Sequence, residues 1–147
     1  MINQILEYIR AVIVATYSTK TILPNSHELT DNTDVYLKNG YGVIAGDASV
    51  DSLGGKVSTK VVRNMSMSLT KRIYDTDLQS ASRISVESTL FTESLALIEA
   101  ISTDKTVKEA ITNIDFLGDN GIRLLEIEKI KYLTITVDFE MKYNEFY

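Results

Sequence analysis

The chain has 147 residues, of which 44% are hydrophobic, and it carries a formal net charge of −5. This length fits one domain of ordinary size, and the apolar content excludes a chain that is mainly disordered. The acidic balance argues against nucleic acid as a main ligand, because phosphate binding needs clustered Lys and Arg. The absence of cysteine excludes disulfides and thiolate metal sites.

The N-terminus predicts an amphipathic helix over residues 2–17, with apolar side chains at helical spacing, and we expect that stripe to pack in the core. It lacks the basic region and continuous apolar run of a signal peptide. No segment approaches the ~18 apolar residues of a membrane span. Residues 18–34 are rich in Thr, Ser, Asn and Asp and contain Pro24, which predicts a long loop with a short strand near Thr21–Leu23.

Two strands are expected next. Residues 35–45 predict a strand broken at Lys38–Gly40, and residues 46–55 predict a loop of small and turn-forming residues. Residues 57–73 predict a long strand, because apolar side chains hold most odd positions and polar ones the even positions. Val62 and Arg63 break this alternation, so we expect a bulge or bend there.

The second half predicts a helix and then three strands. The helix begins between Arg83 and Leu90 and ends near Ser102, with several Ser and Thr residues able to cap it. A strand over residues 110–117 is followed by the turn sequence Gly-Asp-Asn-Gly at 118–121, which favours a tight hairpin to residues 122–128. Residues 133–143 alternate apolar and polar side chains without a break, as in an antiparallel sheet covered on one side.

These elements predict the fold class. The strands are not separated one by one by helices, which argues against a doubly wound parallel sheet. We therefore predict a single α+β domain over residues 1–147. It has an antiparallel (mixed) sheet of about five strands, with two helices packed on one face.

No catalytic arrangement stands out. The one histidine, His27, lies in the polar loop and is interpreted as solvated. Zinc is disfavoured, because cysteine is absent and a second histidine is missing. Asp47, Ser49 and Asp51 are spaced like oxygen ligands, but the sequence lacks an EF-hand pattern, so turn chemistry is the preferred interpretation. We expect no catalytic residue, cofactor or metal ion.

Two further groups of side chains have alternative interpretations. Asp138 and Glu140 share a strand face, which permits acid–base work but is better explained by a solvated or inter-subunit face. Tyr143, Phe146 and Tyr147 crowd the end of the sequence, where aromatic side chains with a polar handle suit an interface. Alternatively, Tyr143 completes the inner face of its strand and the last two residues fray.

The order of elements and the local sequence resemble one protein family. The run from Tyr41 to Asp47 leads into small residues, the long strand ends Leu-Thr-Lys-Arg-Ile-Tyr at 69–74, and an acidic, serine-rich turn precedes the helix. In this respect residues 2–143 are similar to the tail terminator and tail-completion proteins of tailed bacteriophages, which join head and tail at the neck. The likeness lies in the order of the elements and in the local character of the sequence, since the family has no invariant catalytic signature.

The resemblance implies a structural virion protein in the tail or neck, assembled in the host cytoplasm. It would form a homo-oligomeric ring, six-fold or a multiple of six, against other head–tail connector or tail proteins. DNA would pass through without sequence-specific binding, and no membrane would be involved. The expected interface residues lie in the loop, on the polar face of the last strand and at its end: Asp47, Ser49, Asp51, Leu53, Lys56, Thr134, Thr136, Asp138, Glu140, Tyr143, Phe146 and Tyr147.

Two other functions stay open on the sequence. One is a small non-catalytic ligand-binding or accessory domain that acts as a dimer, which would need a defined apolar pocket. The other is an enzyme that uses Asp and Glu with a bound metal ion, which would need carboxylates clustered in space.

Overall fold

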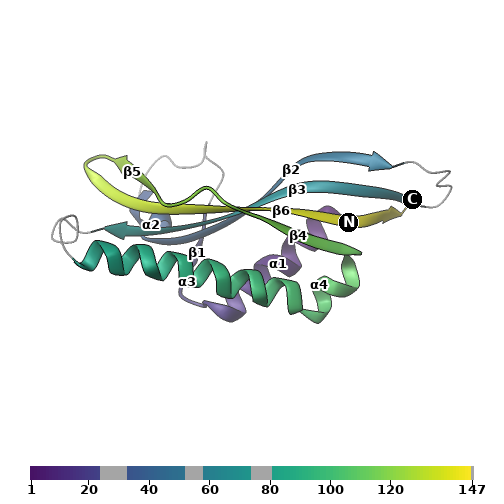
Figure 1. Cartoon of the computed structure of the whole chain (residues 1–147), viewed down its shortest axis with the longest axis horizontal. Coiled ribbons are helices and arrows are strands. Elements are labelled where there is room, and N and C mark those ends of the chain that lie inside the picture. The colour runs from purple at the N-terminus through teal and green to yellow at the C-terminus, as the bar shows by residue number, and fades with distance from the viewer. Residues whose placement is uncertain (24–32, 52–57, 74–80, 147) are drawn as a thin grey trace.

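The computed structural model describes residues 1–23, 33–51, 58–73 and 81–146 of the chain (Figure 1). Helices and strands alternate irregularly along the sequence. In order they are α1 (Ile2–Thr16), β1 (Thr21–Ile22), α2 (Thr33–Leu37), β2 (Asn39–Asp51), β3 (Ser58–Ile73), α3 (Ala81–Thr103), α4 (Lys105–Ala110), β4 (Asn113–Asp119), β5 (Arg123–Ile127) and β6 (Ile130–Phe146).

One mixed, six-stranded sheet organises the fold. Its order is β1-β2-β3-β6-β4, with β5 also paired to β6, and only the β1–β2 pair is parallel. Helices α1, α3 and α4 lie together on one side of the sheet (Figure 1). The predicted α+β class is therefore confirmed, with one strand more than expected. The expected pair of helices corresponds to α1 and α3. The structure adds two short helices, α2 and α4, that the sequence analysis did not predict.

The core lies between this helical layer and the sheet. Strands β3 and β6 pair over their whole length, so that Met67 faces Val137 and Leu69 faces Ile135 across the strands. All six apolar side chains that alternate along β6, from Leu133 to Tyr143, are at most 2% exposed. The period of two predicted for both long strands is thus confirmed, and the apolar stripe of α1 packs in the same core.

Strand β2 departs from the expected strand and loop. The residues before Lys38 form helix α2, and β2 then continues through most of the predicted loop as far as Asp51. Gly46 and Asp47 form a bulge between Ala45 and Ala48, opposite Asn64. The bulge expected at Val62 and Arg63 thus lies on the neighbouring strand. Regular pairing to β3 overrides the weak strand preference of these small residues.

The predicted hairpin at residues 118–121 is wrong. Strands β4 and β5 do not pair with each other. They follow one another along the same side of β6, where Asp119 faces Val137 and Arg123 faces Thr134. The Gly-rich turn sequence interrupts this edge, with φ of +129° at Gly118 and +75° at Gly121. Pairing along β6 decided the outcome, because β4 and β5 gain more from pairing with this long buried strand than from pairing with each other.

The true hairpin joins β5 to β6 through Glu128 and Lys129, which have φ of +51° and +67°. A two-residue turn with two positive φ values favours Asn-Gly, because other residues are strained in this conformation. We expect the double substitution Glu128→Asn and Lys129→Gly to raise the free energy of unfolding by about 1 kcal/mol. Urea denaturation measures the change. Glu126→Asn, on extended backbone two residues earlier, is the control, and an equal gain there would contradict the turn explanation.

Candidate functional site

A buried polar cluster lies between the sheet and α3. Its members are Lys20 before β1, Asn39 at the start of β2, Lys71 on β3 and Glu93 on α3. The Lys20 amine donates to Asn39 Oδ1 at 2.9 Å and to Glu93 Oε1 at 3.2 Å. The Lys71 amine lies 3.3 Å from the same two acceptor atoms, Asn39 Oδ1 and Glu93 Oε1. Two ammonium groups therefore share one carboxylate and one amide oxygen.

Burial governs the electrostatics of this cluster. The side chains of Lys20 and Glu93 are 1% and 11% exposed. Burial lowers the pKa of Lys20, and Lys71 acts in the same direction, whereas Glu93 opposes the shift. An amine with a lowered pKa is a potential nucleophile. The Lys20 amine is enclosed by its own partners and offers no room for a substrate, so we assign the cluster a structural role.

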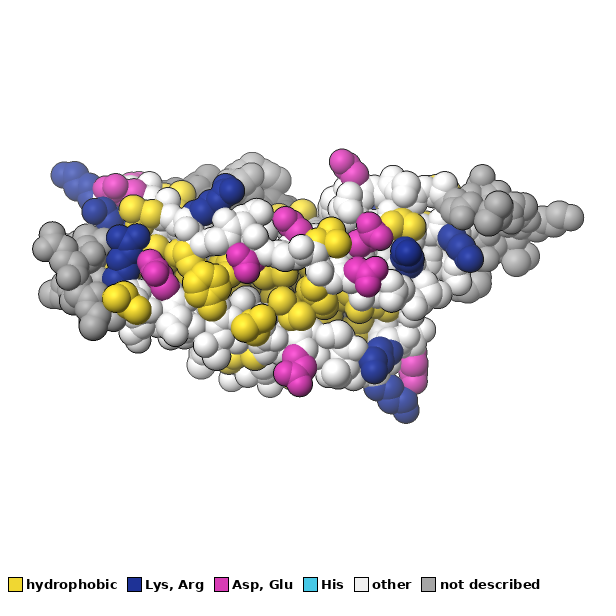
Figure 2. Space-filling view, viewed as in Figure 1, with side chains coloured by type: hydrophobic (Ala, Val, Ile, Leu, Met, Phe, Trp, Pro, Cys, Tyr) yellow, Lys and Arg dark blue, Asp and Glu magenta, His cyan; other side chains and the backbone are white. Residues whose placement is uncertain are grey.

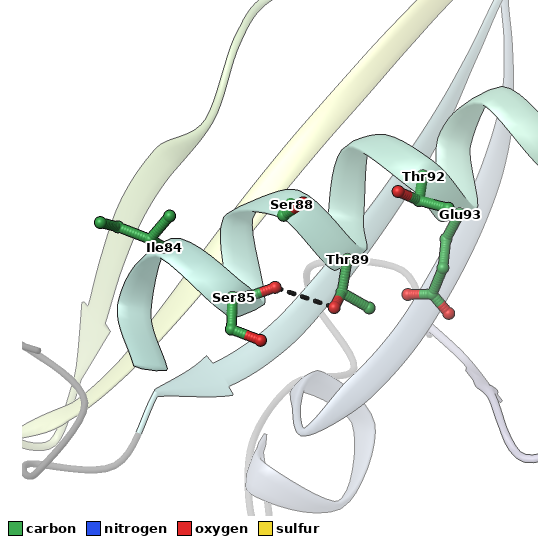
Figure 3. A pocket seen from close by; sticks show the side chains of 6 residues that line it. All are labelled: Ile84, Ser85, Ser88, Thr89, Thr92 and Glu93. Atoms are coloured by element: carbon green, nitrogen blue, oxygen red, sulfur yellow. Dashed lines mark hydrogen bonds between the residues drawn. The ribbon is translucent and has the colours of Figure 1, made fainter. Parts of the chain in front are cut away.

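A depression of about 450 Å³ runs beside the first half of α3 (Figure 3). Its described lining comes from α3 alone and consists mainly of small hydroxyl side chains: Ile84, Ser85, Ser88, Thr89, Thr92 and Glu93. The Thr89 hydroxyl donates to the Ser85 carbonyl at 2.8 Å. The Glu93 carboxylate is already held by the two lysines. The depression therefore lacks a paired nucleophile and base among its described residues, and it is an open surface rather than an active-site cavity.

A second polar cluster ties α2 to the opposite face of the sheet. Asp34, in the first turn of α2, accepts from the Tyr132 hydroxyl at 2.9 Å and from the Arg72 guanidinium at 3.0 Å. Tyr132 is 1% exposed. Burial, and then the hydrogen bond to Asp34, raise the pKa of Tyr132 to about 12. These contacts fix α2 over the ends of β3 and β6.

The raised pKa of Tyr132 predicts an alkaline loss of stability. The folded chain keeps the phenol proton up to about pH 12, whereas an unfolded tyrosine loses it near pH 10. The protonated Tyr132 phenol therefore contributes on the order of 2 kcal/mol to the free energy of unfolding. This contribution is complete below pH 10 and is lost as the pH rises to 12. Denaturation of Tyr132→Phe should show a smaller loss over this range. The partly buried Tyr8→Phe, which removes a phenol elsewhere in the chain, is the control. An unchanged slope in Tyr132→Phe would contradict the assignment.

The polar face of β6 lies in the middle of the sheet. Thr134, Thr136, Asp138 and Glu140 are each partly exposed there, on the side away from α1 and α3. The Thr136 and Ser68 hydroxyls lie 3.1 Å apart. These four expected interface residues are thus on one accessible surface, which is a sheet face rather than an edge.

Carboxylates gather on this face without forming a metal centre. Asp115 on β4 faces Glu140 directly, and Asp138 is two residues away on the same strand. Like charges placed opposite one another destabilise a strand pair. Among the described residues, no group of three or more His, Cys, Asp and Glu side chains is arranged to hold a metal ion.

The other expected interface residues are divided. Asp47 and Ser49 are exposed on β2. Asp51 ends β2 and Phe146 ends β6, but their side chains lie outside the described residues, as do Leu53, Lys56, Tyr147 and His27. Tyr143 is 2% exposed and its hydroxyl accepts from Arg63 Nε at 3.0 Å. Its ring packs inside the chain, which agrees with the alternative interpretation and removes it from the accessible surface.

The sheet has two free edges in the described part of the chain. Strand β1 pairs only with Gly40 and Tyr41, so β2 has no neighbour beyond them on that side. On the opposite side, β4 and β5 pair only with β6. Each edge exposes large apolar side chains: Ile22, Ile44 and Val50 on the first, and Leu117, Leu124 and Leu125 on the second. Figure 2 shows hydrophobic side chains in a band between α3 and the β4–β5 edge.

Two signals for these features were present in the sequence. Arg63 and Lys71 occupy odd positions of β3 and so point toward the buried face, where each needs a partner. Arg63 finds Tyr143 and the Gly46 carbonyl, at 3.0 and 2.9 Å, and Lys71 finds Glu93. The second signal is that the sequence of α3 has apolar residues on more than one side of the helix, so that some of them are exposed in one subunit. The sequence did not indicate which residues would pair with Arg63 and Lys71, because those partners are distant in sequence.

The chain was compared with protein-family models and with curated proteins. No protein-family model matches the chain, and no curated protein matches it. None of the described helices is long and apolar enough to cross a membrane.

Proposed function

We propose that this chain is a structural subunit of a homo-oligomeric ring at the head–tail junction of a tailed virus. In this role it joins the connector to the tail and lets DNA pass. The observation that carries the ring is the pair of sheet edges on opposite sides of one subunit, which expose apolar side chains and have no neighbouring strand among the residues that the structure describes. They differ in sequence and shape, so a contact between them is heterologous. Heterologous contacts generate a ring when the rotation closes.

The polar sheet face supports a channel wall. Its centre carries hydroxyls and carboxylates, among them Ser68, Thr136, Asp138 and Glu140. Carboxylates repel DNA phosphates, so DNA would slide past without sequence-specific binding. The place at the neck, the six-fold symmetry or its multiple, and the connector and tail partners come from the sequence resemblance. The virion is the corresponding location.

Native mass by light scattering over a range of concentrations, followed by negative-stain imaging, tests the ring. We expect a closed ring with a central hole, either alone or after addition of a head connector or tail tube. A chain that stays monomeric or dimeric under all of these conditions contradicts the proposal and favours the dimeric binding domain.

A further inference from the structure

The outer face of α3 carries exposed apolar and small hydroxyl side chains but little charge. Between Ile84 and Ile98 the helix contains two charged residues, Glu87 and Glu93. Glu93 is held in the buried cluster, and Glu87 accepts from Arg83 at 3.2 Å. A helix at a protein surface normally presents a charged or polar face to water. Depletion of charge is instead the mark of the centre of an interface.

The apolar side chains of this face form one row. Ile84, Phe91 and Leu95 follow helical spacing and are 69%, 40% and 66% exposed, with the small Ser88 between them. Leu124 of β5 is 50% exposed. It faces Leu133 across the strands and so points to the same side of the sheet as α3. These four residues define the α3 band.

The exposed area of the α3 band is about half of what one side of a standard interface buries. Its four side chains expose on the order of 400 Å², within the range of patches that are often functional. A standard interface buries about 800 Å² per partner, of which slightly more than half is apolar. The band therefore supplies about the apolar share of one such interface.

The β1–β2 edge offers an apolar surface of the kind that could cover this band in a second copy of the chain. Ile22 of β1 is 45% exposed and pairs in register with Tyr41, so it lies on the helix side of the opposite edge. Strand β2 runs antiparallel to β4 and β5. If β2 of a second copy lay beside β4 and β5, neighbouring strands would therefore still run in opposite directions across the contact. Bulges at Gly46–Asp47 and near Leu117 limit strand pairing to short stretches. Side chains of the helical layer must then supply most of the contact.

We infer that the α3 band of one copy is covered by the β1–β2 edge of the next, with Ile22 packed against Leu95. This inference rests on the proposed ring and names the two surfaces that form its repeating contact.

The first experiment places a charge in the band. Leu95→Glu should abolish the ring in native mass measurements, with at least a tenfold loss of the assembled species at a given concentration. Thr106→Glu adds the same charge on the exposed side of α4 and should leave the ring intact. Circular dichroism of both variants checks that they fold. A folded Leu95→Glu variant that still forms rings overturns the inference and leaves the proposed function standing.

The second experiment uses the absence of native cysteine. Ile22→Cys and Leu95→Cys are prepared separately, mixed and oxidised. We expect a disulfide between the two different variants, formed faster than in a mixture of Ile22→Cys with Thr106→Cys. Preferential pairing of Leu95→Cys with itself would show a two-fold contact and overturn the inference. Failure of the mixed pair to exceed the control overturns it as well, whereas a wild-type chain without rings contradicts the proposed function itself.

Discussion

Replacing Glu93 by glutamine is expected to lower the free energy of unfolding by about 3 kcal/mol, because the change leaves the buried Lys20 ammonium and the partly buried Lys71 ammonium without a counter-charge. Both oxygens of Glu93 contact Lys20 at 3.2 Å, and Oε1 also contacts Lys71 at 3.3 Å. Lys20 has little alternative solvation, since its side chain is 1% exposed. Chemical denaturation at neutral pH measures the loss.

Two comparisons make this result specific. Glu99→Gln removes the same charge from an exposed site on α3 and should change stability by less than about 0.5 kcal/mol. Combining Glu93→Leu with Lys20→Met removes the closest buried pair together and should recover much of the loss. A Glu93→Gln variant as stable as Glu99→Gln would show that water reaches the lysines and that the cluster does not hold α3. Because α3 carries the proposed contact surface, the cluster also sets the position of that surface.

Replacing Gly40 by alanine is expected to destabilise the chain by about 3 kcal/mol, at the upper end of ordinary overpacking. A Cβ atom at this position would lie 2.3 Å from the Tyr36 carbonyl oxygen, 2.7 Å from Leu23 and 2.8 Å from the Thr70 hydroxyl. The first of these is backbone, so α2 or the start of β2 must move.

Gly42, two residues along the same strand, is the matched control. A Cβ atom there meets only the Leu23 side chain, at 3.5 Å or more, which is ordinary contact. Gly42→Ala should therefore be close to neutral. Thermal unfolding of both variants tests the difference. Equal melting temperatures would mean that α2, which carries the Tyr36 carbonyl, moves away from Gly40 without loss of stability. In that case the contacts of Asp34 with Arg72 and Tyr132 would not hold α2 firmly.

The fold class and the long elements were readable from local pattern. A period of two in residues 133–143 needs only one buried face, and the structure buries every apolar residue of that set. The helical stripe of α1 was equally clear. Of the candidate interface residues, the four on β6 were correctly placed on one polar face, whereas Tyr143 proved to be core.

Pairing and polar partnerships were decided by the tertiary structure. The turn sequence at 118–121 favours a hairpin locally, but β6 offers a long pairing surface to both β4 and β5 and determines their path. Lys20 meets Glu93 across 73 positions, and Tyr132 meets Asp34 across 98. Composition and periodicity determined that an acidic α+β domain with two long strands would form. Which edges stay free and which charges are buried depended on contacts between distant residues, because local patterns carry no information about them.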